Sequence, residues 1–290
     1  MTTFESIAVT GASGQLGRLV IADLLKAVPD ARLIGLVRNP AAARDLADRG
    51  VALRTASYDD PASLTSALTG VGKLLLISSS EIGKRVAQHR NVIEAAKAGG
   101  VKLIAYTSLL HADTSPMELA KEHRETEALI RASGIPFVIL RNGWYTENYT
   151  GTIAAALEHG AVFGAARNGR IASAARADYA AAAAAVLVDG ENQTGKIYEL
   201  AGDAAFTLSD YAAEIARQSG KPVVYKDLPE AEYKALLQSA GLPEAFAAII
   251  AESSAKAAAD SLYDASRQLS RLIGRPTTTM SQSVAAALAR

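Results

Sequence analysis

A glycine-rich turn near the start of the chain constrains the fold more than any other feature. Residues 7–10 form an apolar, β-branched run typical of a buried parallel strand. The run leads directly into Gly11-Ala12-Ser13-Gly14-Gln15-Leu16-Gly17. Residues 16–25 then place leucine and valine on one face of an amphipathic helix. A strand, a glycine turn and a helix in this order predict a dinucleotide site, which a glycine triplet alone would not.

The three glycines of such a turn have separate roles. One permits the tight turn, one lets the backbone approach a pyrophosphate, and one lets the helix pack closely on the strand. The helix that follows directs its free N–H groups and the positive end of its dipole at the phosphates. We therefore expect residues 11–17 to bind the pyrophosphate of the cofactor.

Composition excludes several other classes of protein. Among 290 residues, 49% are hydrophobic, which is enough for a sizeable core. Lys and Arg number 30 and so do Asp and Glu, so no basic surface indicates nucleic acid or an anionic membrane. The chain has no cysteine, and its four histidines lack metal-ligand spacing, so we expect no disulfide and no metal. We expect His89 and His123 to face a cleft or solvent. With no leader and no membrane-spanning run, the sequence predicts a cytoplasmic protein.

Strands and helices alternate through the first half of the chain. Strands are expected at 32–37, 51–56, 73–77, 101–107 and 137–140, and helices at 41–48, 61–69, 85–98 and 119–133. This order predicts an α/β fold: a Rossmann-type doubly wound parallel sheet with right-handed crossovers.

The pattern changes after about Arg141. Helices are expected at 177–187, 208–219 and 230–239, with isolated strands at 197–200 and 223–225. We therefore predict an NADP(H)-binding Rossmann domain over residues 1–141. A smaller, mostly helical substrate-side lobe would cover 142–290, with some chain returning to the Rossmann domain. Ligands of such folds bind in clefts at the carboxyl edge of the sheet.

An arginine follows the second predicted strand, at the point where the type of dinucleotide is selected. NAD-binding units present Asp or Glu to the ribose 2′-hydroxyl there, whereas NADP-binding units present Arg. This strand ends in Val37-Arg38-Asn39, with no acid. A guanidinium can pair with a 2′-phosphate and stack on adenine. The alternative is an ordinary exposed arginine, but Arg38 favours NADPH as the cofactor.

Polar and aromatic residues follow three further strands. The hydroxyl residues after the fourth and fifth strands stand where a chain can pass close to the nicotinamide ribose, although the serines could also form a polar loop. After the sixth strand, amides can hold a carboxamide and aromatic side chains can line a planar pocket. Trp144 could instead fill the core. The expected cofactor contacts are Ser78, Ser79, Ser80, Thr107, Asn142, Gly143, Trp144, Tyr145, Thr146 and Glu147.

The glycine turn and these strand ends together resemble the NmrA-like group of atypical short-chain dehydrogenases/reductases. The resemblance extends through 104–116, 171–180 and 272–279, so it covers nearly the whole chain. It implies NADPH-dependent reduction of quinones, the small-molecule partner, by direct hydride transfer without flavin. It also implies that Arg176 reaches into the cleft from the second lobe. Many relatives carry an acid near the adenine where this chain has Ser57, with Asp59 two residues later.

The tyrosine acid of typical short-chain dehydrogenases is missing. Those enzymes use Tyr-x-x-x-Lys, in which lysine lowers the tyrosine pKa so that the tyrosine can protonate a carbonyl oxygen. Here Lys121 is preceded four residues earlier by Met117, which argues against carbonyl–alcohol chemistry and indicates a solvated lysine. If a protein group donates a proton, His111 and Tyr145 are the candidates, although His111 could be a plain surface-loop residue.

Two other functions remain open from the sequence. One is reduction of another planar conjugated acceptor, such as a triphenylmethane dye. The other is a non-catalytic NmrA-like redox sensor that binds NADP(H) and regulates a protein partner. The alanine-rich helices are compatible with a homodimer, and core packing explains them equally well.

Overall fold

The computed structural model describes residues 5–28 and 32–289, and these form two compact units. Unit 1 comprises residues 1–112, 121–142 and 176–198, and unit 2 comprises 113–120, 143–175 and 199–290. The expected absence of a leader concerns the N-terminal residues, of which 1–4 lie outside the described part. Among the described residues, no helix is long and apolar enough to cross a membrane.

A seven-stranded sheet organises unit 1, in the order β3-β2-β1-β4-β5-β6-β8. Its strands are β1 (Ile7–Val9), β2 (Leu33–Val37), β3 (Ala52–Thr55), β4 (Lys73–Leu76), β5 (Leu103–Leu109), β6 (Phe137–Asn142) and β8 (Ile197–Leu200). The five pairings from β3 to β6 are all parallel, which confirms the doubly wound α/β fold. The order reverses between β1 and β4, and ligands of open α/β sheets bind beside the carboxyl ends at such a reversal.

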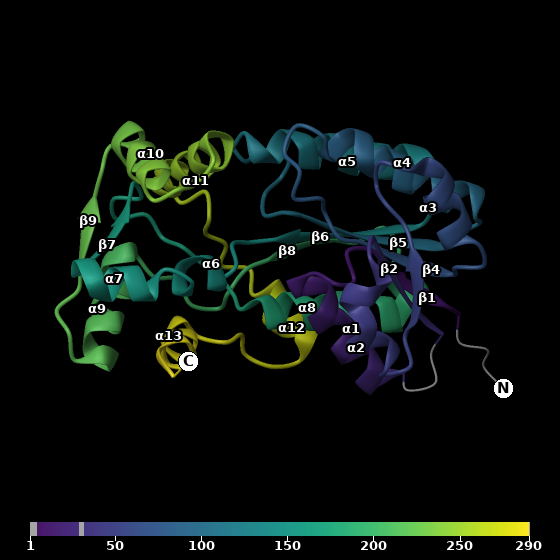
Figure 1. The fold of residues 1–290 in the computed structure, drawn as a ribbon, viewed down its shortest axis with the longest axis horizontal. Coiled ribbons are helices and arrows are strands. Elements are labelled where there is room, and N and C mark those ends of the chain that lie inside the picture. Colours follow the sequence, from purple (N-terminus) through teal and green to yellow (C-terminus); the bar gives the residue numbers. More distant parts are fainter. Residues whose placement is uncertain (1–4, 29–31, 290) are drawn as a thin grey trace. The chain divides into compact units, whose positions relative to one another are not determined.

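Helices cover both faces of this sheet (Figure 1). One face carries α3 (Pro61–Leu68), α4 (Arg85–Ala98) and α5 (Leu119–Ser133), and the other carries α1 (Gln15–Ala27), α2 (Arg44–Ala47) and α8 (Arg176–Asp189). Short 3₁₀ turns η1 (Pro40–Ala43) and η2 (Gly190–Gln193) follow β2 and α8. Buried aliphatic side chains fill the α3–α5 side, including Leu64, Leu68, Leu76, Ile93 and Ile139.

Unit 2 is mostly helical and contains a second, two-stranded parallel sheet of β7 and β9. Its elements are α6 (Glu147–Thr150), α7 (Ile153–His159), β7 (Ala161–Gly164), α9 (Leu208–Ser219), β9 (Val224–Asp227), α10 (Glu230–Ser239), α11 (Glu244–Ala257), α12 (Gln268–Ile273) and α13 (Met280–Leu288). The capping box of Thr207 and Asp210 begins α9, because each group satisfies a free donor of the other.

Two strands differ from expectation, and the helices α6, α7, α12 and α13 were not predicted either. The strand β7 was not predicted, and residues 197–200 were expected to form an isolated strand among helices. That strand is β8, which lies beside β6 at the edge of the main sheet. Backbone hydrogen bonds from Ile139 N–H to Lys196 O and from Gly195 N–H to Phe137 O hold the entry to β8 against β6.

Candidate nucleotide-binding and catalytic site

The glycine turn between β1 and α1 has the geometry of a phosphate loop. Gly11 has φ of 57°, in the left-handed region that favours glycine. The Gly14 N–H donates to Gly11 O over 2.9 Å and closes the turn. A Cβ on Gly17 would lie 2.4 Å from Gly11 O, so this glycine lets the helix pack against the turn. A Cβ on Gly14 would lie 3.1 Å from the same oxygen, a milder conflict.

The N-terminus of α1 is suited to an anion. The helix begins at Gln15, and Gly14, as its N-cap, offers no side chain to satisfy the free N–H groups. Its first turn, all of whose residues are described, carries no acidic side chain. The free N–H groups and the helix dipole therefore favour a phosphate here.

Arg38 is exposed at the carboxyl end of β2, directly after buried Val37. Asn39 accepts a hydrogen bond from Ala41 N–H and begins the 3₁₀ turn η1, which fixes the backbone just beyond Arg38. The structure therefore places a guanidinium at the strand end where the sequence predicts selection of the 2′-phosphate.

Sequence reasoning missed a second arginine near this turn. Arg18 Nε donates to Ser13 O over 2.9 Å, and its Nη2 donates to Ala42 O over 2.9 Å. The same side chain forms an ion pair with Asp45. Arg18 thereby ties the glycine turn to the segment that follows β2.

A buried hydroxyl network joins the carboxyl ends of β1, β4 and β5. Thr10 Oγ1 accepts from Ile77 N–H over 2.9 Å and bonds Tyr58 Oη over 2.6 Å. The Ser78 N–H donates to Thr107 Oγ1 over 2.9 Å. Thr107, predicted as a cofactor contact, is thus buried and supports the backbone of the predicted contact Ser78.

The residues after β3 are held by hydrogen bonds within the protein. Ser57 Oγ accepts from Asp59 N–H over 3.3 Å. The Asp59 carboxylate accepts from Gln88 Nε2 over 3.1 Å, so the acid that follows Ser57 bonds a helix side chain.

His89 and His123 are both buried, which corrects the expectation that they face a cleft or solvent. Burial, followed by the nearby charge of Arg85, lowers the pKa of His89 to about 3. Burial also lowers the pKa of His123 well below its usual value. His123 Nδ1 bonds the Tyr106 hydroxyl over 2.7 Å. Both imidazoles are therefore neutral parts of the fold around β4 and β5.

Asn142 ends β6 with its side chain buried. Among the described residues its Oδ1 atom has no hydrogen-bond partner. A buried, unpartnered acceptor costs free energy unless a ligand supplies a donor. A nicotinamide carboxamide N–H₂ is such a donor, so this oxygen fits the nicotinamide end of NADPH.

The residues after Asn142 belong to unit 2. Trp144, Tyr145 and Glu147 are half-buried there. Thr146 is buried, with its hydroxyl 2.8 Å from Ser173 Oγ and its N–H donating to Ala174 O. Gly143 N–H donates to Leu200 O over 2.7 Å. These bonds fix the segment that the sequence predicts to face the nicotinamide.

Arg176 differs from its expected position. It is the first residue of α8, which belongs to unit 1 and not to the second lobe. The physical reason is that α8 packs against α1 and against the strands of the main sheet.

The catalytic candidates are held on different segments. Met117, at the position of the usual tyrosine, is buried, and Lys121 is exposed, as the sequence predicts. His111 is half-buried in unit 1 with φ of 52°, an uncommon conformation for a residue with a side chain. Tyr145 is half-buried in unit 2.

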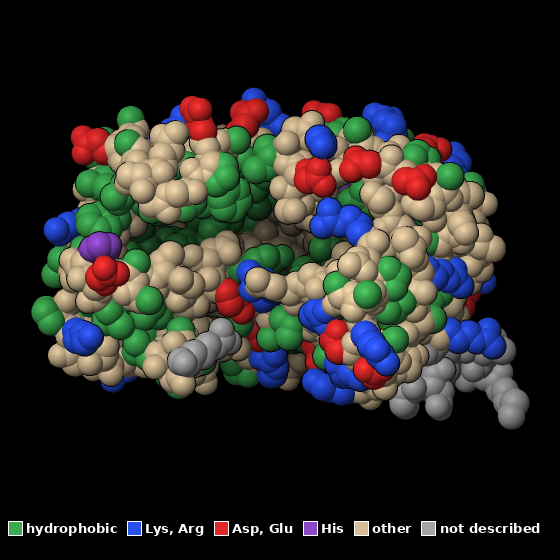
Figure 2. Space-filling view, in the orientation of Figure 1, with side chains coloured by type: hydrophobic (Ala, Val, Ile, Leu, Met, Phe, Trp, Pro, Cys, Tyr) green, Lys and Arg blue, Asp and Glu red, His purple; other side chains and the backbone are tan. Residues whose placement is uncertain are grey.

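Aromatic side chains cluster in unit 2. The ring centroids of Tyr149, Phe206 and Tyr211 lie 5.8 to 6.2 Å apart. Burial raises the pKa of Tyr149 and of Tyr211, so both phenols stay protonated. Figure 2 shows apolar side chains gathered in a hollow beside α10 and α11 of this unit.

A groove of about 710 Å³ lies elsewhere, between α1 and α8. Alanines, Val188 and the polar residues Asp23, Asp189 and Asn192 line it. None of its lining residues belongs to the predicted site.

Known proteins resemble this chain over nearly its whole length. The model of the NmrA-like family matches residues 3–280. Quinone oxidoreductase 2 of Escherichia coli K12 is 59% identical over 278 residues, which cover 96% of this chain and 97% of that protein. NAD(P)H azoreductase of Xenophilus azovorans is 27% identical over 95% of this chain and 96% of its own.

Solved structures resemble the fold closely. The crystal structure of E. coli NADPH-dependent quinone oxidoreductase complexed with NADPH has a TM-score of 0.94 at 57% identity, covering 97% of this chain and 99% of that one. Citrobacter triphenylmethane reductase complexed with NADP(H) has a TM-score of 0.93 at 40% identity, covering 97% and 100%. An NmrA mutant, at 16% identity and a TM-score of 0.79, shows the fold alone.

Proposed function

The chain belongs to the NmrA-like family, and from that premise we propose that it is an NADPH-dependent quinone oxidoreductase that works by direct hydride transfer without flavin. The similarity to quinone oxidoreductase 2, at 59% identity over nearly all of both chains, carries this proposal. The residues of the strand ends support it.

Unit 1 supplies groups that fit NADPH. The turn 11–17 and the N-terminus of α1 would hold the pyrophosphate, and Arg38 would pair with the 2′-phosphate. The unpartnered Oδ1 of Asn142 would accept from the carboxamide. Bound NADPH supplies the hydride, and the protein binds it, orients it and positions the acceptor.

A quinone suits a site that lacks the usual acid. Met117 cannot donate a proton, and it is buried where typical relatives place a tyrosine. A quinone becomes aromatic when it is reduced, so positioning its ring supplies most of the help it needs. His111 and Tyr145 are our candidates for a protein proton donor, and water is the other source.

A second acceptor class deserves a direct comparison. Triphenylmethane reductase is 40% identical to this chain, which favours cationic dyes as an alternative acceptor. Turnover of a small quinone, measured beside turnover of a triphenylmethane dye, separates these two substrate classes.

The test is NADPH oxidation by the purified, flavin-free protein, followed by the loss of near-ultraviolet absorbance with and without a simple quinone. Quinone-dependent turnover supports the proposal. Dye turnover alone would move the assignment to the second class. Tight NADPH binding without turnover of either acceptor would contradict the enzyme proposal and favour a sensor that acts on a protein partner.

Location and assembly form part of the same proposal. A cytoplasmic location would give the protein the NADPH that it needs, and cell fractionation tests it. A homodimer is compatible with the alanine-rich helices, and sedimentation of the purified protein measures its oligomeric state.

A further inference from the structure

One face of α4 holds the turn that follows β4. Arg85, Gln88 and His89 share this face because they are spaced i, i+3 and i+4 on the helix. Arg85 Nε donates to the carbonyl oxygen of Ser79 over 2.8 Å, and the Ser79 N–H donates to His89 Nε2 over 2.9 Å. The Ser79 hydroxyl donates to Gln88 Oε1. One helix therefore binds the amide, the carbonyl and the side chain of a single residue.

These helix side chains are removed from water. The exposed fraction is 5% for Arg85, 2% for Gln88 and 0% for His89. Burial of a polar side chain is unfavourable unless the side chain is fully hydrogen-bonded. The backbone groups of Ser79 at the strand end could have been satisfied by water, so their satisfaction does not by itself require these buried side chains. All three bind Ser79, in addition to their other partners, and together they fix the conformation of that residue.

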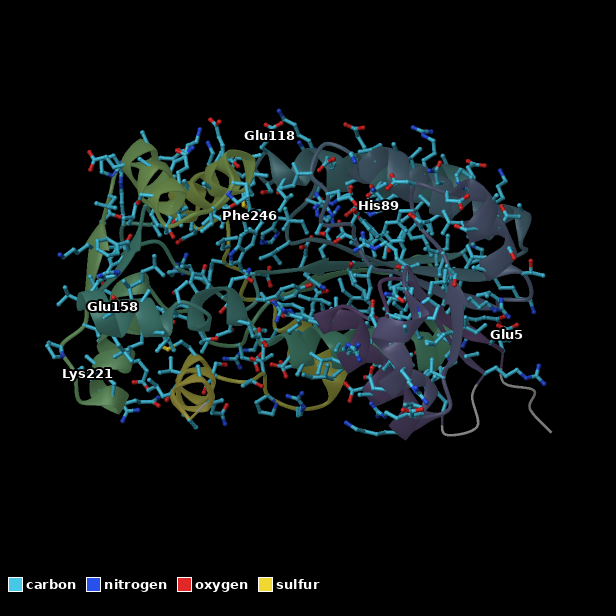
Figure 3. All side chains as sticks on the ribbon, viewed as in Figure 1. Glu5, His89, Glu118, Glu158, Lys221 and Phe246 are labelled. Carbon is cyan, nitrogen blue, oxygen red and sulfur yellow. The ribbon has the colours of Figure 1, made fainter. Side chains whose placement is uncertain are left out.

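A second layer of bonds fixes the imidazole. His89 Nε2 accepts from an amide N–H, so the ring proton is on Nδ1, which lies 3.0 Å from Thr126 Oγ1. Thr126 Oγ1 in turn donates to Glu122 O over 2.9 Å, and the Glu122 carboxylate pairs with Arg85 over 3.0 Å. Figure 3 shows His89 on the side of the sheet covered by α4 and α5. Helix α5 therefore orients the α4 side chains that bind the turn.

These hydrogen bonds also determine which groups of the 78–80 turn remain available to a ligand. The N–H of Ser78 bonds Thr107 and the N–H of Ser79 bonds His89, so both amides are engaged within the protein. Ser78 is half-buried and Ser80 is exposed. We therefore expect this turn to meet a ligand through Ser78 and Ser80 and not through the engaged amides.

We propose that Arg85, Gln88 and His89 are positioning residues, which hold Ser79 so that the 78–80 turn meets the nicotinamide ribose of NADPH in one fixed conformation. This inference rests on the proposed function, because it assumes that NADPH passes this turn. It extends that function by assigning a role to three buried side chains that act through Ser79.

Two substitutions of His89 separate the effect of losing the hydrogen bond to Ser79 from the effect of losing the imidazole ring. In His89→Gln the side-chain amide reaches the place of Nε2 and can still accept from Ser79 N–H. In His89→Asn it reaches only the place of Nδ1, so the contact to Thr126 can persist while the Ser79 N–H loses its acceptor. If His89→Asn does not fold, Gln88→Leu replaces it as the test variant; it removes the bond to the Ser79 hydroxyl together with the bond to Asp59.

The expected result has two parts. His89→Asn should raise the Kd and KM for NADPH about tenfold, and His89→Gln should restore most of the affinity, since one hydrogen bond is at stake. Binding of 2′,5′-ADP should be unchanged in both variants, because that fragment carries only the adenine end and does not reach the 78–80 turn. A merely structural role would not separate the two ligands.

The control is Ser133→Ala. Ser133 Oγ accepts from Ile135 N–H over 3.1 Å, so this variant also removes a side-chain acceptor from a backbone amide. Ser133 ends α5 just before β6, at the amino end of the strands, and NADPH affinity should be unchanged. Equal weakening of NADPH and 2′,5′-ADP in His89→Asn, or NADPH affinity equal to the wild type, would overturn the positioning role.

Measurements on the wild-type protein distinguish a failure of this inference from a failure of the proposed function. If the wild type binds NADPH but turns over no quinone, the proposed function fails, and the binding comparison still tests the three positioning residues. If the wild type does not bind NADPH, both proposals fail.

Discussion

Arg38 is the residue on which the choice of cofactor depends. Replacing it with Glu should weaken NADPH binding by about 2 kcal/mol or more, roughly thirtyfold in Kd, because a charge-assisted pair is lost and a repulsion is added. NADH lacks the 2′-phosphate and should lose little affinity. Titration of both nucleotides measures the difference.

The matched control for Arg38 is Arg49→Glu, which makes the same charge change at another exposed arginine of unit 1. It should leave the ratio of the two affinities unchanged. Equal losses for NADPH and NADH in Arg38→Glu would contradict the 2′-phosphate assignment.

Two glycines of the turn should respond differently to substitution. Gly14 has an ordinary extended backbone, and a Cβ there meets only Gly11 O at 3.1 Å. Gly14→Val should therefore fold and lose affinity for both nucleotides, because its side chain occupies the pyrophosphate approach. Gly17→Ala should instead lower the Tm, because its Cβ meets backbone at 2.4 Å. Thermal melts and nucleotide titration test both, and unchanged nucleotide affinity in Gly14→Val would contradict the phosphate-loop assignment.

At the scale of elements, local patterns predicted most of unit 1. Residues 85–98 and 119–133 form helices with the predicted bounds, because capping, breaker and periodicity signals are local. The strand β7 was missed because its four residues pair only with β9, about sixty residues later. The place of β8 was wrong for the same reason, since its partner β6 is distant in sequence.

The polar face of α4 was also missed, although the sequence carried a signal. Arg85, Gln88 and His89 continue into Val92, Ile93 and Ala96 at helical spacing, and all six are buried. The first turn of this stripe is polar, so hydrophobic periodicity alone does not show it. The partners of these polar side chains, Ser79 and Glu122, come from other elements, and a local sequence pattern does not predict such contacts.

A buried ion-pair group joins α5 to β5 and β6. Glu127 accepts from Arg141 Nε and Nη2 over 2.9 Å each and from Ser108 Oγ over 2.7 Å, and it pairs with Arg131. Burial acts to raise the pKa of Glu127, but these hydrogen bonds outweigh it and lower the pKa below its usual value.

Glu127→Gln should therefore cost about 3–5 kcal/mol of unfolding free energy, because it removes the buried carboxylate charge that pairs with Arg141. Urea unfolding measures the loss. Glu125→Gln changes an exposed acid two residues earlier on the same helix and should cost less than about 0.5 kcal/mol. Similar losses in the two variants would show that the buried pair adds nothing specific.

The whole molecule should lose stability in mild acid. The pKa of His89 is about 3 when folded and 6.5 when unfolded, so between these values the unfolded chain binds the extra proton. Stability therefore falls as pH falls below about 6.5, by about 2 kcal/mol from this residue between pH 7 and pH 5. His123, whose pKa is also lowered, acts in the same direction, and Glu127 adds a loss below its unfolded pKa.

Urea midpoints at pH 7 and pH 5 test this expectation. His89→Gln removes one of the two buried imidazoles, so its stability should depend less on pH than that of the wild type, whatever its absolute value. An unchanged dependence on pH would mean that His89 is not a buried neutral group.

The return of residues 176–198 to unit 1 has a consequence for how the protein is made. Helix α8 packs against α1 and against β4, β5 and β6, all of which leave the ribosome before it does. Between them the ribosome must first deliver residues 143–175, which belong to the other unit. During that interval the surfaces that α8 will cover stay open to chaperones and proteases. The nucleotide-binding unit is therefore finished only late in translation, and a nascent chain stalled near residue 142 would still lack one helix of the layer formed by α1, α2 and α8.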